Sequence, residues 1–358
     1  MVFAVTGGAW ALPVRPAAAQ TPGVAVEPAR SLEEIQRDLN DAGQAMSDAV
    51  PTMEALYEPA QREKAAEKAL PAMRRLSRLL DEYVRAEPRA AIQIGRASME
   101  LKAWMAILGE KPAEDDIRRM TVSNEDEEAT SAKAWSVLIR WVRGKAEPLA
   151  QEKLAVELAA LAKARPNNPT IAQVAAVMTE TAANPTLSEQ AEKVVSDDLK
   201  GPMAQQVAQG LAAKRKLRAL LNKPLVIEAT AVDGSKFSSA AWKGKVILVD
   251  FWATWCPPCR AELPEIQKAY AQYHEKGLEI VGISSDRDID DLKGFLSQNP
   301  AMPWPQLFEP SKPGWHPLAD QYGIERLPTM FLIDRKGVVR SVTAHEDYKS
   351  MIPKLLAE

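Results

Sequence analysis

The run that decides the fold is Val249-Asp250-Phe251-Trp252-Ala253-Thr254-Trp255-Cys256-Pro257-Pro258-Cys259. Its last four residues form a Cys-x-x-Cys pair, which holds both cysteines of the 358-residue chain. Two thiols at this spacing can open and close a small disulfide ring reversibly. The pair therefore predicts redox chemistry.

The residues on either side predict a strand that ends, and a helix that begins, at the first cysteine. Lys245 to Trp252 is a short, apolar, β-branched run typical of a buried strand. Arg260 to Tyr270 carries apolar residues at helical spacing. The free N–H groups and partial positive charge of a helix N-terminus favour a thiolate at Cys256. Cys259, deeper in the helix, is the expected resolving thiol.

A Cys-x-x-Cys pair has two other common uses. A structural zinc site needs four ligands, yet the three histidines, His274, His316 and His345, are scattered and show no ligand spacing. A purely structural disulfide between cysteines three apart closes a tiny loop and gains little chain-entropy stabilisation. We therefore predict redox use, with no metal and no cofactor.

Residues from about Lys223 to Glu358 resemble the thioredoxin superfamily, and within it the TlpA/ResA-type extracytoplasmic thiol–disulfide oxidoreductases. The resemblance rests on Phe251-Trp252-Ala253-Thr254-Trp255-Cys256-Pro257-Pro258-Cys259-Arg260-Ala261-Glu262-Leu263-Pro264 and on the distant Tyr322-Gly323-Ile324-Glu325-Arg326-Leu327-Pro328-Thr329. It implies that Pro328 is cis and packs beside the sulfurs, and that the Leu327 backbone binds a substrate segment. It also implies substrate contacts at Trp255 and Pro257. Trp252 and Trp255 are expected to form an apolar docking surface; core packing is the alternative for both, and it is favoured more for Trp252 on the strand than for Trp255.

Two carboxylates are candidate catalytic groups by the same resemblance. Asp250 matches the buried aspartate of thioredoxin that moves the proton of the resolving cysteine, although many TlpA-type proteins have asparagine there. Glu262 matches a glutamate that tunes the thiols in ResA-like proteins, and its alternative role is a favourable charge in the first helical turn. No lysine clearly matches the partner of thioredoxin's aspartate.

The Pro257-Pro258 dipeptide predicts the direction of the chemistry. Proline has no N–H, so only Cys259 and later residues can donate to a Cys256 thiolate. Fewer donors mean a smaller depression of the thiol pKa. A less stabilised reduced form is the better reductant. We therefore expect a reduction potential nearer to that of thioredoxin than to that of DsbA.

The flanking pattern predicts an α/β domain over residues 219–358, with a central mixed sheet flanked by helices, and the resemblance implies that its fold is thioredoxin-like. The expected elements are an opening hairpin around Asp233-Gly234, a strand at Leu278–Ser284, a helix at Ile289–Gln298, a hairpin turning at Asp334–Gly337 and a closing helix at Asp347–Leu356.

Residues 31–218 predict an all-α domain, either a bundle or a short solenoid, because apolar residues recur at helical spacing and strand-like runs are scarce. The expected helices are Leu32–Asp48, one around Leu70–Tyr83, Arg89–Gly109, Thr130–Arg143, Pro148–Ala164, Thr170–Ala183, Ser188–Leu199 and Met203–Leu221. Gly109–Pro112 is interpreted as a break, and Glu125–Glu128 as an acidic loop. The helix pairs are reminiscent of tetratricopeptide hairpins, but the 34-residue signature is not evident.

The N-terminus predicts export. Val2 to Leu12 is a short apolar run, and Ala17-Ala18-Ala19 supplies a small-residue cleavage pattern, although no lysine or arginine precedes the run. We expect a signal peptide at 1–19, with an uncleaved anchor as the alternative, and a linker at 20–30. The expected location is extracytoplasmic, either periplasmic or membrane-anchored and facing the periplasm.

These observations predict an exported oxidoreductase that reduces protein disulfides through attack by Cys256 and resolution by Cys259. Its partners would be proteins with disulfides or cysteines and a membrane or periplasmic thiol electron donor. The alternatives are an oxidant or isomerase of the DsbA/DsbC kind, or a helical interaction protein with a redox-locked domain. The helical region would recruit clients, form a homodimer or act as a spacer. The formal charge of -3 gives no case for nucleic-acid binding.

Overall fold

The computed structural model describes residues 30–47, 49, 56, 58–144, 147–309 and 315–358. The chain forms two compact units, Met1–Ala208 and Gln209–Glu358. The division falls inside helix α10 (Pro202–Arg218), at whose end the predicted boundary between residues 218 and 219 lies. That boundary remains a proposal. The predicted signal peptide and, except for Arg30, the predicted linker lie outside the described residues.

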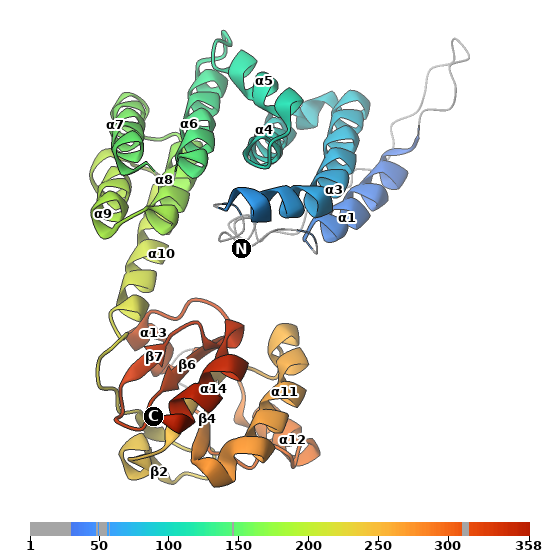
Figure 1. Cartoon of the computed structure of the whole chain (residues 1–358). Coiled ribbons are helices and arrows are strands. Elements are labelled where there is room, and N and C mark those ends of the chain that lie inside the picture. The colour runs from blue at the N-terminus through green and yellow to red at the C-terminus, as the bar shows by residue number, and fades with distance from the viewer. Residues whose placement is uncertain (1–29, 48, 50–55, 57, 145–146, 310–314) are drawn as a thin grey trace. The chain divides into compact units, whose positions relative to one another are not determined.

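The first unit is helical, and its described residues contain no strand (Figure 1). Its helices before α10 are α1 (Leu32–Ser47), α3 (Pro59–Ala86), α4 (Ala91–Ile107), α5 (Lys111–Met120), α6 (Asp126–Arg143), α7 (Pro148–Ala164), α8 (Pro169–Thr181) and α9 (Pro185–Lys193). The predicted all-α character is confirmed.

Prolines and asparagines decide where several of these helices begin. Helices α3, α7, α8 and α9 start at a proline, whose missing N–H would have no helical partner there. Asn168 caps α8 by accepting the N–H groups of Thr170 and Ile171, and Asn184 caps α9 by accepting that of Leu187. The two Asn-Pro pairs, Asn168-Pro169 and Asn184-Pro185, are therefore helix starts.

One prediction in this unit is wrong. The expected acidic loop Glu125–Glu128 is the N-terminus of α6, with Glu125 as its N-cap and three carboxylates in its first turn. Negative charge is favourable there, so the charge run is a helix start rather than a break. The predicted break at Gly109–Pro112 is confirmed, because α4 ends at Ile107 and the next helix begins at Lys111; that helix, α5, was not predicted.

The second unit contains a five-stranded mixed sheet in the order β5-β4-β3-β6-β7. The strands are β3 (Val246–Trp252), β4 (Leu278–Ser284), β5 (Gln306–Leu307), β6 (Thr329–Ile333) and β7 (Val339–Ser341). Strand β3 is central, parallel to β4 and antiparallel to β6. A separate antiparallel hairpin joins β1 (Glu228–Thr230) to β2 (Lys236–Ser238), as predicted. The thioredoxin-like α/β class is thus confirmed.

Helices pack on both faces of this sheet (Figure 1). Alternate residues of β3, including Leu248 and Trp252, share a core with α11 (Pro257–Tyr273), α12 (Ile289–Gln298) and α14 (Tyr348–Ala357). The intervening residues, such as Phe251, share the opposite core with α13 (Pro317–Tyr322). This alternation decides which face each later side chain can reach.

Candidate redox site

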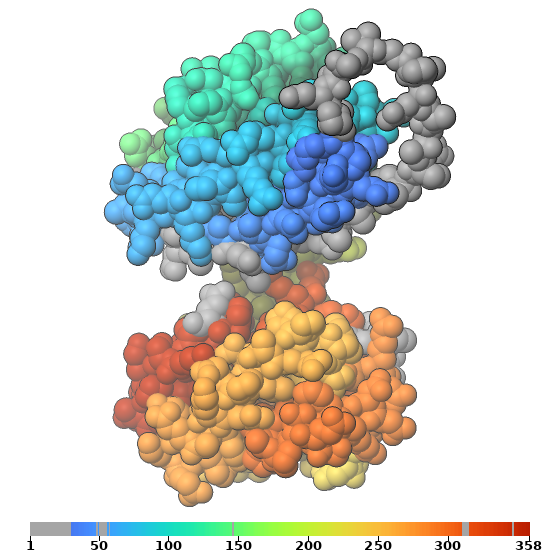
Figure 2. Space-filling model, turned by 90° about the vertical axis from the view of Figure 1, so that its right-hand side faces the viewer, coloured from blue at the N-terminus to red at the C-terminus, as the bar shows by residue number. Residues whose placement is uncertain are grey.

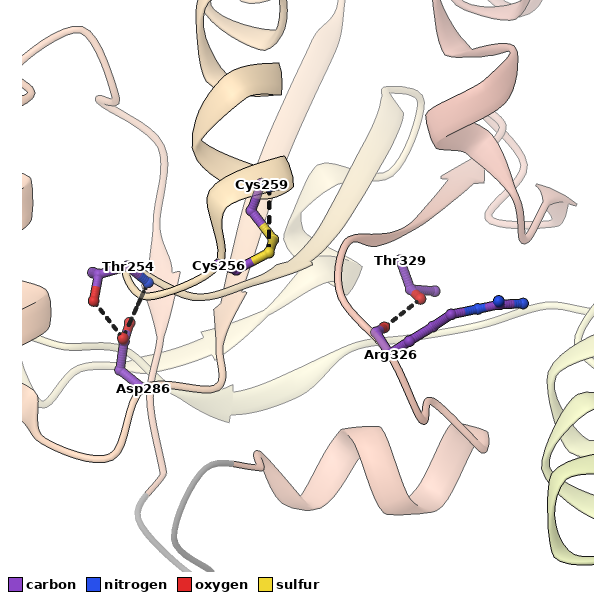
Figure 3. The surroundings of a disulfide bond; sticks show 6 residues. All are labelled: Thr254, Cys256, Cys259, Asp286, Arg326 and Thr329. Atoms are coloured by element: carbon purple, nitrogen blue, oxygen red, sulfur yellow. Dashed lines mark hydrogen bonds between the residues drawn. A yellow bond between two sulfur atoms is a disulfide. The ribbon is translucent and has the colours of Figure 1, made fainter. Parts of the chain in front are cut away.

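Cys256 and Cys259 form a disulfide at the start of α11 (Figure 3). Cys256 is the N-cap residue, and its Sγ accepts the backbone N–H of Cys259 at 3.3 Å. Pro257 and Pro258 occupy the first helical positions and donate nothing. Both cysteines are buried, while Trp255 is 53% exposed and Pro257 is also exposed. The first cysteine therefore lies at the edge of an exposed surface.

A buried carboxylate anchors the loop between β3 and the disulfide. Asp286 accepts the Thr254 backbone N–H at 3.0 Å and the Thr254 hydroxyl at 2.6 Å (Figure 3). It also accepts the Ser284 hydroxyl at 2.7 Å. Because Asp286 follows β4, it connects the ends of two adjacent parallel strands. Asp286 was not predicted from the sequence, although its place two residues after a buried strand was the available signal.

The Leu327–Pro328 peptide bond is cis, as the resemblance implied. Antiparallel pairing places Thr329, the next residue, opposite Phe251. The cis bond therefore lies at the end of β3 where the cysteine loop begins. Leu327 is half-buried and packs against the core that contains both cysteines. The Thr329 hydroxyl donates to the Arg326 carbonyl at 2.8 Å and closes this segment (Figure 3).

The two tryptophans before the disulfide have different environments. Trp252 is fully buried, and its indole N–H donates to Gln306 Oε1 at 2.9 Å. The prediction that Trp252 helps form a docking surface is therefore wrong. The strand alternation turns its side chain into the core, whereas Trp255 lies in the loop beyond the strand and is exposed.

Asp250 lies on the β3 face that packs against α11 and α14, and it is 3% exposed. Its Oδ1 has no hydrogen-bond partner among the described residues. Burial, followed by the charge of Glu262, raises the pKa of Asp250 from 3.8 to about 7. A carboxyl group with this pKa can exchange a proton near neutral pH.

Glu262 lies on the first turns of α11, and its side chain is 30% exposed. It accepts the hydroxyl of Tyr348 at 2.6 Å, and Lys349 Nζ is 3.8 Å away. Tyr348 was not predicted as a site residue, because it is far from the motif in the chain and carries no local signal. The structure thus brings a phenol into the group formed by the two predicted carboxylates.

Replacing Asp250 by asparagine is expected to remove a pH dependence of stability. A raised pKa means that the folded state holds the proton more tightly than the unfolded chain does. Wild-type stability should therefore fall as the pH rises from about 4 to about 7. Above pH 8, D250N should be the more stable protein, by at most about 4 kcal/mol, since one pKa unit corresponds to about 1.4 kcal/mol.

Hydrogen exchange of the β3 amides in the oxidised protein, corrected for the intrinsic pH dependence of exchange, measures this effect in the second unit alone. The advantage of D250N should shrink between pH 8 and pH 4. Parallel curves for the two proteins over that range would mean that Asp250 does not titrate there.

Comparison with known proteins places this geometry in a family. Residues 212–357 match the Redoxin family. The thiol-disulfide oxidoreductase ResA of Bacillus cereus is 30% identical over 158 residues, which cover 44% of this chain and 88% of the relative. ResA of Bacillus thuringiensis subsp. konkukian is 34% identical over 127 residues, covering 36% of this chain and 70% of the relative.

A crystal structure of a thioredoxin-family thiol:disulfide interchange protein from Chlorobium tepidum TLS is 28% identical. The match covers 38% of this chain and 96% of the Chlorobium chain, with a TM-score of 0.33. The sequence relatives match the part of the chain in which a helix-capping Cys-x-x-Cys disulfide and a cis-proline lie at the end of one strand. The chain therefore belongs to the TlpA/ResA-type thiol–disulfide oxidoreductases of the thioredoxin superfamily.

Proposed function

We propose that the protein is an exported reductase of protein disulfides, in which Cys256 is the attacking thiol and Cys259 the resolving thiol. The observation that carries the proposed direction is the hydrogen bonding at Cys256 Sγ. The first backbone N–H that reaches this sulfur is that of Cys259, because two prolines intervene. A thiolate with fewer donors is less stabilised, which makes the dithiol the stronger reductant.

The reaction starts from the reduced pair. The Cys256 thiolate attacks one sulfur of a client disulfide, and the client's other sulfur leaves as a thiolate. Cys259 then loses its proton to Asp250, directly or through water, and attacks Cys256 Sγ. This step releases the second client sulfur and forms the Cys256–Cys259 bond. Two electrons pass to the client, so a thiol donor must reduce the enzyme again.

The surroundings of Cys256 support a protein client. Trp255 offers an exposed aromatic surface directly before the cysteine. The backbone at Leu327, beside the cis-proline, lies at the same end of the sheet and would bind the client's cysteine segment. The exposed ring of Pro257 would extend this contact.

A groove of about 550 Å³ also opens between α11 and α12, and Pro257, Arg260 and Phe295 are among its lining residues. Figure 2 shows the gold and orange segments of these two helices side by side on one face. Pro257, which lines this groove, directly follows Cys256 in the sequence. A client bound at Cys256 would therefore extend into the groove.

The N-terminal apolar run and small-residue pattern support export, and both lie outside the described residues. In the part of the chain that the structure describes, no helix combines the length and apolar character needed to cross a bilayer. We propose an extracytoplasmic location, with electrons supplied by a membrane or periplasmic thiol donor.

The reduction potential of the Cys256–Cys259 pair tests the direction. We expect a value near or below that of thioredoxin, about −270 mV. Equilibration with dithiothreitol or glutathione, followed by thiol trapping and mass spectrometry, measures it. A value near that of DsbA, about −120 mV, would instead make the protein an oxidant and refute the proline argument.

A matched variant isolates the contribution of the prolines. Replacing Pro257 by alanine restores an N–H one residue after Cys256, which can donate to the thiolate only if the loop geometry allows it. If the new N–H donates to the thiolate, the reduction potential of the Cys256–Cys259 pair should rise. If it does not, the reduction potential should stay unchanged. A lower potential in P257A than in the wild type would contradict the proposed cause.

A further inference from the structure

Asp250 shares one packed region with the disulfide. Along β3, Val246, Leu248 and Trp252 pack in the same core as Cys256 and Cys259, and the two-residue alternation puts Asp250 on this face. The same core contains Tyr348 from α14. Asp250 is the polar member of an otherwise apolar row, so its charge depends on a few nearby groups.

Tyr348 links α14 to Glu262 of α11 through a side-chain hydrogen bond. It is 1% exposed, and its hydroxyl donates to Glu262 Oε1 at 2.6 Å across the space between α14 and α11. Burial, and then the hydrogen bond to Glu262, raises the pKa of Tyr348 above its ordinary value. The phenol therefore keeps its proton at physiological pH and remains a hydrogen-bond donor.

Two other charged groups near Glu262, Lys349 and Glu265, lie on the same two helices. Lys349 Nζ lies 3.8 Å from Glu262 Oε1 and 3.3 Å from Glu265 Oε2, but its side chain is 58% exposed. An ion pair that exposed is weak and easily exchanged for water. The buried phenol is therefore the stronger restraint on Glu262.

A hydrogen bond from Tyr348 has two effects on Glu262. It fixes the position of Oε1, the oxygen that also lies 3.8 Å from Lys349 Nζ, and it ties the carboxylate to the buried end of α14. A negative charge held near Asp250 makes ionisation of Asp250 less favourable. The phenol thus influences Asp250 without contacting the sulfurs.

We propose that Tyr348 is a positioning residue whose hydrogen bond holds the Glu262 carboxyl group beside Asp250, so that Glu262 influences proton exchange at Asp250. This proposal deepens the proposed function and rests on it for its use, because Asp250 would take the proton of Cys259 during resolution. Tyr348 itself neither gains nor loses a proton. Its hydroxyl only determines where the charge of Glu262 lies.

The test is the titration of Asp250 in the oxidised full-length protein, in which the cysteines carry no titratable proton. Aspartate labelled with ¹³C at Cγ gives one NMR signal per residue, and D250N assigns that of Asp250. In Y348F the midpoint of the Asp250 titration should fall by about half a pH unit or more, because the repelling charge moves away. E262Q, which removes that charge, should lower the midpoint at least as much.

The double variant Y348F/E262Q separates a positioning effect from a local one. If Tyr348 acts through Glu262, Y348F should cause no further shift in the E262Q background. An unchanged midpoint in Y348F would overturn the proposal, and so would an equal shift in both backgrounds. If Y348F does not fold, the Cζ signal of labelled Tyr348 in the wild type should follow the titration of Asp250, and this response should be lost in E262Q.

A kinetic measurement connects the titration with turnover. The rate of resolution of a Cys256 mixed disulfide should rise with pH as Asp250 ionises, and the rise should begin at lower pH in Y348F. If the pH dependence of the resolution rate were the same in Y348F as in the wild type, the proposed use of Asp250 would be contradicted. A protein that shows the NMR coupling but reduces no disulfide would refute the proposed function while leaving the Tyr348–Glu262–Asp250 coupling intact.

Discussion

Replacing Cys256 by serine is expected to lower the rate of protein disulfide reduction by at least about a thousandfold, since the hydroxyl cannot form the mixed disulfide. The matched variant C259S keeps the attacking thiol but cannot resolve the intermediate. It should therefore accumulate a covalent complex with the client that dithiothreitol releases. Non-reducing electrophoresis with a disulfide-containing protein measures both outcomes.

The two cysteine variants also test the assignment of roles. C256S should trap no client, because Cys259 is buried and lies one helical turn further along α11. If C256S trapped client and C259S did not, the two roles would be exchanged. If C256S retained the whole cellular effect of the protein, the redox pair would serve only to lock a conformation.

Replacing Gly323 by alanine is expected to destabilise the second unit by about 2–4 kcal/mol. Gly323 ends α13 with φ of +75°, a conformation that costs an L-residue about 1–2 kcal/mol. An added Cβ would also overlap the backbone carbonyl oxygen of Ala213 in α10. Backbone atoms cannot move aside as a flexible side chain can, so the packing of α10 against this segment must loosen.

Gly337→Ala is the matched control. Gly337 has a similar φ of +82°, but no atom lies within 4 Å of an added Cβ. The Gly337→Ala variant should therefore lose only the free energy that a positive φ costs an alanine. Hydrogen exchange of the β3 and β6 amides compares the two variants within the same unit. Equal losses of stability would mean that the contact between α10 and Gly323 adds nothing.

The strongest sequence signals predicted the redox unit closely. Strand β4 and helix α12 have the predicted bounds, and β3 and α11 differ from the prediction only at their ends. These elements have clear apolar periodicity and distinct ends. The cis-proline was foreseen only through the resemblance of the Leu327-Pro328 segment, because residue spacing carries no such information.

The elements that were missed depend on contacts distant in sequence. Strand β5 is two residues long, too short for any periodicity. It pairs with β4 opposite Gly282, where an added Cβ would overlap the side chain of Gln306. Helix α13, which begins at Pro317, is six residues long and is also too short to show a clear helical periodicity. Tyr348 is a core residue whose polar end matters only because α11 and α14 lie close together.

The hydrogen bonds of Asp286 have a consequence for the energetics of turnover. Asp286 holds Thr254 through backbone and side-chain bonds that involve neither sulfur. Breaking the Cys256–Cys259 bond therefore leaves the anchoring of the loop intact. We expect the backbone before Cys256 to differ little between the oxidised and reduced proteins. The reorganisation energy of each cycle would then be confined to the sulfur atoms and the protons around them, so the exchange can run in either direction without refolding the loop.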